Sequence, residues 1–162
     1  MLVLKWVVIV VVAAAVLVVV AGQLGLLAGK APQTLGVRDG RLARPSKTPN
    51  SVSSQADLWA DHPQRDYARI APLALRGDGP STIARLKAIV EALPRAKVVD
   101  SRADYLYAQF TTRVLKFTDD VEFWFDPAGG VVQVRSASRL GRKDFGVNRE
   151  RIEALRARLA AG

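Results

Sequence analysis

The sequence predicts an α+β domain, an antiparallel meander sheet of about four strands covered by two helices, preceded by one N-terminal transmembrane helix. Three observations support this prediction. Residues 6–29 contain no charged side chain, residues 97–138 hold successive segments in which apolar and polar side chains alternate, and an apolar stripe at helical spacing lies on either side of that region. Alternation with a period of two is typical of half-buried strands, and short links between consecutive strands favour antiparallel pairing.

The uncharged run from Trp6 to Gly29 predicts a membrane anchor over residues 1–29. A helix rises about 1.5 Å per residue, so the run reaches roughly 36 Å and can cross a hydrocarbon core of about 30 Å. Signal peptides have shorter apolar cores, of about 7–15 residues, which favours an uncleaved single-pass anchor. Small residues at 13–15 and 21–22 leave cleavage by a signal peptidase as the alternative.

The charges beside the anchor give two opposite indications of the side of the membrane on which the domain lies. Lys5 stands before the apolar run, whereas Lys30 and four further basic residues follow it. By the positive-inside rule the domain would be cytoplasmic. A basic residue followed by a long apolar run at the N-terminus is also typical of an export signal. We favour export, with the soluble domain on the periplasmic or extracytoplasmic side.

Residues 30–48 are expected to form a basic flexible linker to a folded domain at 49–162. The linker holds two Pro and two Gly residues without an apolar period, and it carries five basic residues against one Asp. Such a charge favours membrane lipid with anionic headgroups as a partner. Nucleic acid is not expected as a partner, because no aromatic residue except Phe145 is interleaved with the basic clusters.

Within the domain, the first predicted helix has Asp78 or Ser81 as its cap and ends at Pro94. Its apolar stripe comprises Ile83, Leu86, Ile89, Val90 and Leu93. Two strands are predicted next, at 97–101 and 105–112. The last helix has Asn148 as its expected cap. Its apolar stripe comprises Ile152, Leu155 and Leu159.

The remaining two strands form a hairpin whose register follows from parity. If Pro127–Gly130 make the turn, Phe123 lies opposite Val134 and Glu122 lies opposite Arg135. A slip by one residue would turn the apolar side chains of one strand to the wrong face. The sequence therefore predicts this one register.

Three blocks of the sequence resemble the signature of the DUF1499 family, and together they span about residues 49–160. The blocks are Pro49-Asn50-Ser51-Val52-Ser53-Ser54, Phe117-Thr118-Asp119-Asp120-Val121-Glu122-Phe123, and Arg135-Ser136-Ala137-Ser138-Arg139 followed by Gly141, Asp144, Gly146-Val147-Asn148-Arg149 and Arg151. The resemblance implies a domain of unknown function found in bacterial envelope proteins and in plastid proteins. It supports an envelope location and implies no activity. Ser51 departs from the family pattern, in which many members have Cys, so a thiol role there does not apply.

The charged residues of the hairpin are the candidate functional residues. Asp120 and Glu122 are paired carboxylates on one strand face, and the register adds Arg135 and Arg139 to it. One interpretation is a purely structural ion network, since opposite charges paired across strands contribute roughly 0.2–1 kcal/mol each. Ser136 and Ser138 fall on the other face and are expected to be hydrogen-bonded core residues.

The functional interpretation is an anion site formed by Arg135, Arg139 and Arg149. These would converge beside Asn148 at the start of the last helix, where free N–H groups attract a carboxylate or phosphate. The expected function is that of a membrane-anchored, non-enzymatic envelope module that binds an anionic small molecule, a lipid headgroup or an envelope protein. The alternative is a hydrolase with Asp120 or Glu122 as general base, which would require these carboxylates to open onto a pocket.

Other chemistries have less support in the sequence. The chain has no cysteine, which excludes a disulfide, a thiolate nucleophile and a cysteine zinc site. Carboxylates at 119, 120, 122 and 144 offer oxygen ligands, but the nearby arginines would repel a cation. The only histidine, His62, lies in a predicted loop, and no Gly-x-Ser-x-Gly elbow accompanies it. We therefore expect neither a metal nor another cofactor.

Overall fold

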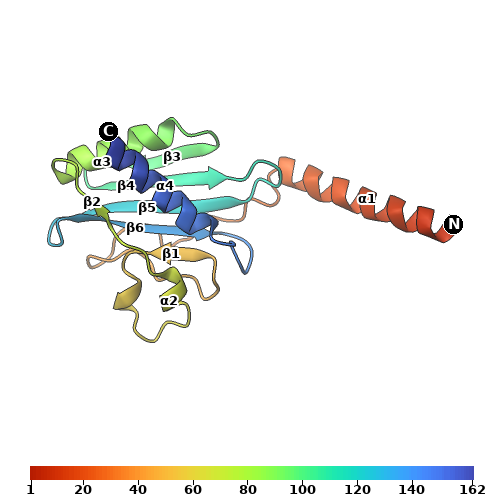
Figure 1. Ribbon diagram of the computed structural model, residues 1–162, viewed down its shortest axis with the longest axis horizontal. Helices are drawn as coiled ribbons and strands as arrows, with labels where there is room; N and C mark the ends of the chain where they lie inside the picture. The colour runs from red at the N-terminus through yellow and green to blue at the C-terminus, as the bar shows by residue number, and fades with distance from the viewer.

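A long N-terminal helix stands out from one end of an α+β domain in the computed structural model, which describes all of residues 1–162 (Figure 1). This helix, α1 (Leu2–Gln23), has 22 residues and therefore a length of about 33 Å. Its most apolar stretch is not buried against the domain, and the helix is long and apolar enough to cross a membrane. The uncharged run was expected to be helical to residue 29, but its last residues form turns.

The domain is built on one antiparallel sheet with the strand order β1-β6-β5-β4-β3, and β2 also pairs with β6. The strands are β1 (Ser51–Ser53), β2 (Leu73–Ala74), β3 (Ala96–Ser101), β4 (Tyr105–Thr111), β5 (Thr118–Asp126) and β6 (Val131–Ser138). The meander of four consecutive strands, β3 to β6, is as predicted. The predicted number of strands was wrong, because the sheet has six.

The two strands that the sequence did not predict are short and lie against β6. β1 has three residues and β2 has two, and both come from a segment rich in serine and proline. Runs this short have no measurable period, and serine is more typical of turns than of strands. Their pairing depends on the edge that β6 offers, which only the folded sheet provides.

The register predicted for the β5–β6 hairpin is confirmed. Phe123 pairs with Val134 and Glu122 pairs with Arg135. At the turn, the side chain of Asp126 accepts hydrogen bonds from the backbone N–H groups of Ala128 (3.1 Å) and Gly129 (3.0 Å). The local chemistry of the turn therefore fixes which side chains of β5 and β6 face the helices.

Two helices cover one face of the sheet (Figure 1), as predicted. They are α3 (Gly79–Glu91) and α4 (Val147–Ala161); the shorter helical turns are η1 (Ala56–Leu58) and α2 (Arg65–Ala68). Asp78 caps α3, because its carboxylate accepts the N–H of Ser81 at 2.7 Å. The core between helices and sheet includes Leu86, Val90, Phe123, Val134, Ile152 and Leu155.

The cap predicted for the last helix was wrong. α4 begins at Val147, and Asn148 is its second residue, with its side chain buried. The carboxylate of Asp144 accepts the backbone N–H groups of Gly146 (3.1 Å) and Asn148 (3.2 Å). Asp is as good a capping residue as Asn, so residue preference by itself did not identify Asp144 as the side chain that binds these N–H groups.

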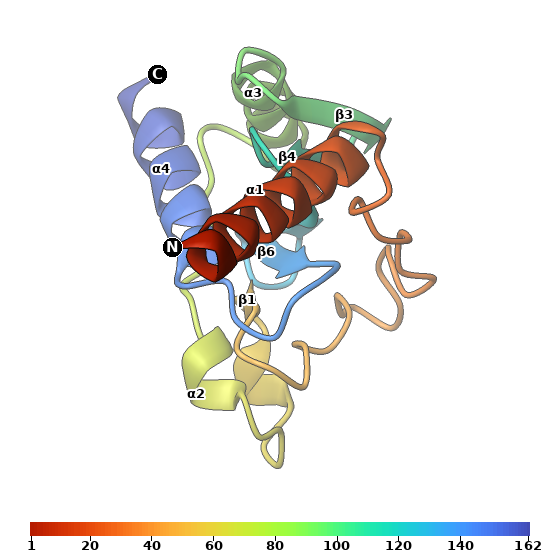
Figure 2. The same cartoon turned by 90° about the vertical axis from the view of Figure 1, so that its right-hand side faces the viewer.

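Residues 30–48, which we call the cover segment, lie over the sheet face that the helices leave free. Figure 2 shows this segment in orange on one side of the sheet and α4 on the other. It is irregular except for a bridge between Arg38 and Arg41, and its Leu42 is only 2% exposed, packed against Tyr105 and Tyr107. We expected a flexible linker here; the structure instead shows a packed segment.

Candidate functional site

Two ion pairs occupy the sheet face beneath the cover segment. Arg135 Nη1 lies 3.3 Å from Glu122 Oε2, and Arg139 Nη2 lies 2.7 Å from Asp120 Oδ1. Both carboxylates are 0% exposed. The predicted sharing of one face by these four residues is therefore confirmed, and the structure pairs each acid with one arginine.

Two tyrosines of β4 complete the hydrogen bonding of these carboxylates. The Tyr105 hydroxyl donates to Glu122 Oε1 at 2.8 Å, and the Tyr107 hydroxyl donates to Asp120 Oδ1 at 2.6 Å. Burial, together with the neighbouring carboxylate, raises the pKa of both phenols above the ordinary value. Both tyrosines therefore remain protonated hydrogen-bond donors.

The cover segment closes this network from above. The backbone N–H of Gly36 donates to Glu122 Oε1 at 2.8 Å. Arg135 Nε donates to the carbonyl oxygen of Arg44 at 3.3 Å. Arg139 Nη1 donates, also at 3.3 Å, to the carbonyl oxygen of Gly29, the residue just before the segment. The two carboxylates are thus bound by arginine and shielded from solvent, which is not the geometry of a general base that needs access to water and substrate.

The four residues of the expected anion site do not come together. Arg135 and Arg139 lie under the cover segment and are paired with acids. Asn148 lies on the helix-covered face, where it accepts a hydrogen bond from the Ser136 hydroxyl at 2.5 Å. Arg149 donates to the backbone carbonyl of Tyr67 at 2.6 Å. The sheet therefore separates Arg135 and Arg139 from the start of α4.

Arg151, and not Arg149, pairs with an acid of β5. Its Nη2 lies 2.6 Å from Asp119 Oδ2, and its guanidinium stacks 4.8 Å from the ring centre of Phe110. Asp119 and Asp120 are adjacent in β5 and therefore face opposite sides of the sheet. The three acids of the β5 block thus each bind a different arginine.

The N-terminal end of α4 is occupied by a carboxylate of the chain itself. Asp144 accepts hydrogen bonds from the Tyr67 hydroxyl, from Asn148 Nδ2 (2.8 Å) and from the two backbone N–H groups described above. Burial by itself raises the pKa of Asp144, but these hydrogen bonds outweigh it and lower the pKa below the ordinary aspartate value. The carboxylate of Asp144 therefore already lies where an external anion would bind at this end of α4.

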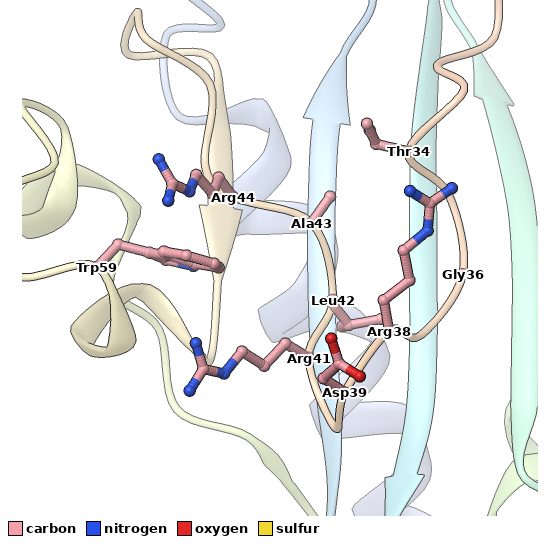
Figure 3. Close-up of a pocket in the computed structure, with 9 residues that line it drawn as sticks. All are labelled: Thr34, Gly36, Arg38, Asp39, Arg41, Leu42, Ala43, Arg44 and Trp59. Carbon is pink, nitrogen blue, oxygen red and sulfur yellow. The ribbon is translucent and has the colours of Figure 1, made fainter.

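A different group of arginines borders a cavity of about 400 Å³ on the outer side of the cover segment (Figure 3). Its lining includes Arg38, Arg41, Arg44 and Trp59, and Asp39 is the only acid among them. None of the three arginines forms an ion pair: the salt bridges of the molecule lie elsewhere. We call this cavity the arginine groove.

The Trp59 ring holds two of these arginines in place. The guanidinium carbon of Arg44 lies 4.3 Å from the ring centre and that of Arg41 lies 5.7 Å from it, and the two side chains approach Trp59 from different sides in Figure 3. Stacking on a ring face leaves the N–H edges of a guanidinium available to an anion. A second hollow of about 840 Å³ adjoins the groove, shares Arg44 and Trp59 with it, and adds Lys47.

The groove was missed by the sequence analysis, although one local signal for it exists. Arg38 and Arg41 exchange backbone hydrogen bonds of 2.9 and 3.0 Å around Asp39 and Gly40, both of which have positive φ. An Asp-Gly pair is a strong signal for a two-residue hairpin turn of this kind. Recognising the turn would have placed the two arginines side by side. Nothing in the sequence indicated that Trp59 would join them.

Fold and site together define an α+β domain whose polar sheet face is closed by ion pairs and by the cover segment that follows an apolar N-terminal helix. The chain belongs to the family described as "Protein of unknown function (DUF1499)", which it matches over residues 41–159. The match confirms the resemblance found in the sequence, and it begins inside the cover segment. No curated protein and no solved structure matches the chain.

A double-mutant cycle tests the buried pair. Arg139→Met leaves the buried Asp120 carboxylate without its arginine, and we expect the free energy of unfolding to fall by about 3–5 kcal/mol. Adding Asp120→Asn should cost less than the sum of the single changes, because the charge is then removed as well. Urea unfolding of the full chain in detergent micelles, followed by tryptophan fluorescence, measures these changes in the free energy of unfolding.

Arg85→Met is the control, because Arg85 is exposed and forms no ion pair. Strictly additive effects of the changes at Asp120 and Arg139 would contradict the pairing.

Acid should remove the stabilisation that Asp144 provides. Since its pKa is lower in the folded chain than in the unfolded chain, the stabilisation is complete above the ordinary aspartate pKa and is lost as the pH falls through the folded value. In Asp144→Asn the difference in unfolding free energy from the native chain should therefore shrink between about pH 5 and pH 2. Urea unfolding at a series of pH values checks this, and a difference that grows in acid would refute the assignment.

Proposed function

We propose that this chain is a membrane-anchored envelope module that binds an anionic small molecule or headgroup in the arginine groove. The observation that supports this proposal is that three arginines without acidic partners border one cavity together with a tryptophan. The arginines that we first expected to bind an anion, Arg135 and Arg139, are neutralised inside the fold. The expected ligand is therefore still an anion, and the arginines of the groove bind it in place of Arg135 and Arg139.

The chemistry of the groove suits a phosphate or carboxylate group. Guanidinium N–H groups form a fork that matches two oxygen atoms of such an anion, and charge-assisted hydrogen bonds are the stronger ones. The volume lies in the range of about 300–1,000 Å³ that is usual for small-molecule sites. Trp59 adds an apolar surface for the rest of the ligand. No observation favours the hydrolase alternative with Asp120 or Glu122.

The anchor in this proposal is α1, with the domain on the periplasmic or extracytoplasmic side. Its support is the length and apolar composition of α1, together with Lys5 at the start of an apolar run. Anionic membrane lipid is the natural neighbour of the basic cover segment. An envelope protein that presents a carboxylate or phosphate is a second possible partner, and nucleic acid is not expected.

Binding is tested with inorganic phosphate and glycerol phosphate as probes. We expect saturable changes in tryptophan fluorescence that Trp59→Phe removes. Arg41→Gln should weaken binding about tenfold or more, since a hydrogen bond to a charged group contributes about 1.5–3 kcal/mol. Arg85→Gln, at an exposed arginine far from the groove, should leave the affinity unchanged. Equal affinity in Arg41→Gln, or no saturable binding by the native chain, would rule out the groove as an anion site.

The side of the membrane is tested with reporter enzymes fused after Gly162. A reporter that is active only outside the cytoplasm, such as an alkaline phosphatase, should be active in this fusion, because an exported domain carries its C-terminus with it. A reporter that is active only in the cytoplasm serves as the matched control and should be inactive. The reverse pattern would place the domain in the cytoplasm, as the positive-inside rule by itself indicates.

A further inference from the structure

Two loops at one end of the sheet contact the chain at and just after the end of α1. The loop 112–117 joins β4 to β5, and Gln23 Nε2 donates to the carbonyl oxygen of Val114 in it at 2.7 Å. Gly22 approaches the same loop so closely that a Cβ there would come within 2.7 Å of the Leu115 carbonyl oxygen. The first loop therefore lies directly against the last turn of α1.

The second loop, residues 139–146, follows β6 and lies at the same end of the sheet. Gly29 contacts it: a Cβ on this glycine would lie 2.9 Å from Arg139 Cβ and 3.1 Å from Leu140 Cγ. Figure 1 shows the blue loop between β6 and α4 at the end of the sheet from which α1 projects. The chain therefore contacts the first loop at the end of α1 and the second loop at Gly29.

The length of α1 fixes the depth of these loops relative to a bilayer that the helix crosses. Its 22 residues span about 33 Å, and a hydrocarbon core is about 30 Å thick. Residues 22 and 23 then lie at the level of the headgroups. Loop 112–117, which touches them, lies at the same level.

Both loops expose apolar side chains. Phe145 is 88% exposed, Val114 is 52% exposed and Leu140 is 44% exposed. Phe145 also has φ of +53°, a left-handed conformation that is costly for a bulky residue and that glycine adopts freely. An exposed phenylalanine in a strained position contributes nothing to the core, and such positions are frequent at functional surfaces.

Basic residues surround these apolar side chains. Arg113 and Lys116 stand in the first loop and Arg142 and Lys143 in the second, and none of them forms an ion pair. The only acid in either loop is Asp144, which is buried and bound to the start of α4. Apolar side chains flanked by unpaired basic residues are typical of surfaces that insert into the headgroup region of an anionic bilayer.

We propose that loops 112–117 and 139–146 form a membrane foot, a peripheral contact in which Val114, Leu140 and Phe145 enter the interface and the basic residues bind anionic phospholipid headgroups. This inference rests on the proposed function only in that α1 crosses a bilayer; it does not depend on a ligand in the arginine groove. The foot holds the domain against the membrane surface instead of leaving it free on a tether.

The absence of cysteine allows a direct test with single-cysteine variants of the full chain. Phe145→Cys carries an environment-sensitive fluorophore, and the chain is placed in nanodiscs of phosphatidylcholine mixed with phosphatidylglycerol. We expect a shift of the emission to shorter wavelength and a loss of quenching by aqueous iodide, relative to the same chain labelled through Ala128→Cys. Ala128 is exposed in the β5–β6 turn, at the end of the sheet away from α1 (Figure 1).

The outcomes separate the foot from the anchor. If the native chain is not retained in nanodiscs, α1 does not anchor it, and both the anchor and the membrane foot are refuted. If the chain is retained but the labels at 145 and 128 are equally quenched, the anchor stands and the foot is refuted. Retention together with protection at 145 and not at 128 supports the foot.

The basic residues are tested in the same nanodiscs. Arg142→Gln combined with Lys143→Gln should reduce the protection of the label at 145. The matched control combines Arg85→Gln with Arg158→Gln, two exposed arginines that line one hollow together with Gly162, and should retain full protection. Protection that is the same in nanodiscs of phosphatidylcholine alone, and unaffected by the first pair of changes, would overturn the role of anionic headgroups.

Discussion

Two carboxylates buried between the sheet and the cover segment constrain the rest of the structure. An ionised carboxylate without exposed surface is costly unless it is paired and hydrogen-bonded, and Asp120 and Glu122 each have an arginine and a tyrosine. Such pairs add little net stability over apolar side chains, but separating their members is strongly destabilising. The network therefore acts against any register of β5 and β6, and any position of the cover segment, that would leave an acid unpaired.

The same constraint decides which arginines are available for binding. Because Arg135 and Arg139 neutralise internal acids, they have no spare charge to offer an anion. The arginines of the cover segment have no acidic partner, and Trp59 holds two of them at the edge of a cavity. A strongly basic chain thus divides its positive charge between a closed structural network and two open surfaces, the arginine groove and the membrane foot.

Much of the fold was predictable because the signals are local. Alternation along β5 and β6 determined their register, and the stripe from Ile83 to Leu93 determined α3, because both depend only on which neighbouring residues are apolar. The carboxylate–arginine pairs followed from that register. Arg149 was expected beside Arg135 and Arg139 but lies elsewhere, since the register of a hairpin does not say on which side of the sheet the next helix will pack.

The sequence by itself determined the family, the apolar N-terminal helix and the four-strand meander. It also determined that Glu122 and Arg135 lie opposite each other, because periodicity and turn chemistry act over a few residues. Only the tertiary structure decided that residues 30–48 pack over the sheet, that Trp59 stacks with arginines from this segment, and that two distant loops contact the end of α1 and Gly29 beyond it. These contacts join segments far apart in the chain. They depend on surfaces that exist only after the sheet has formed, and no local pattern encodes them.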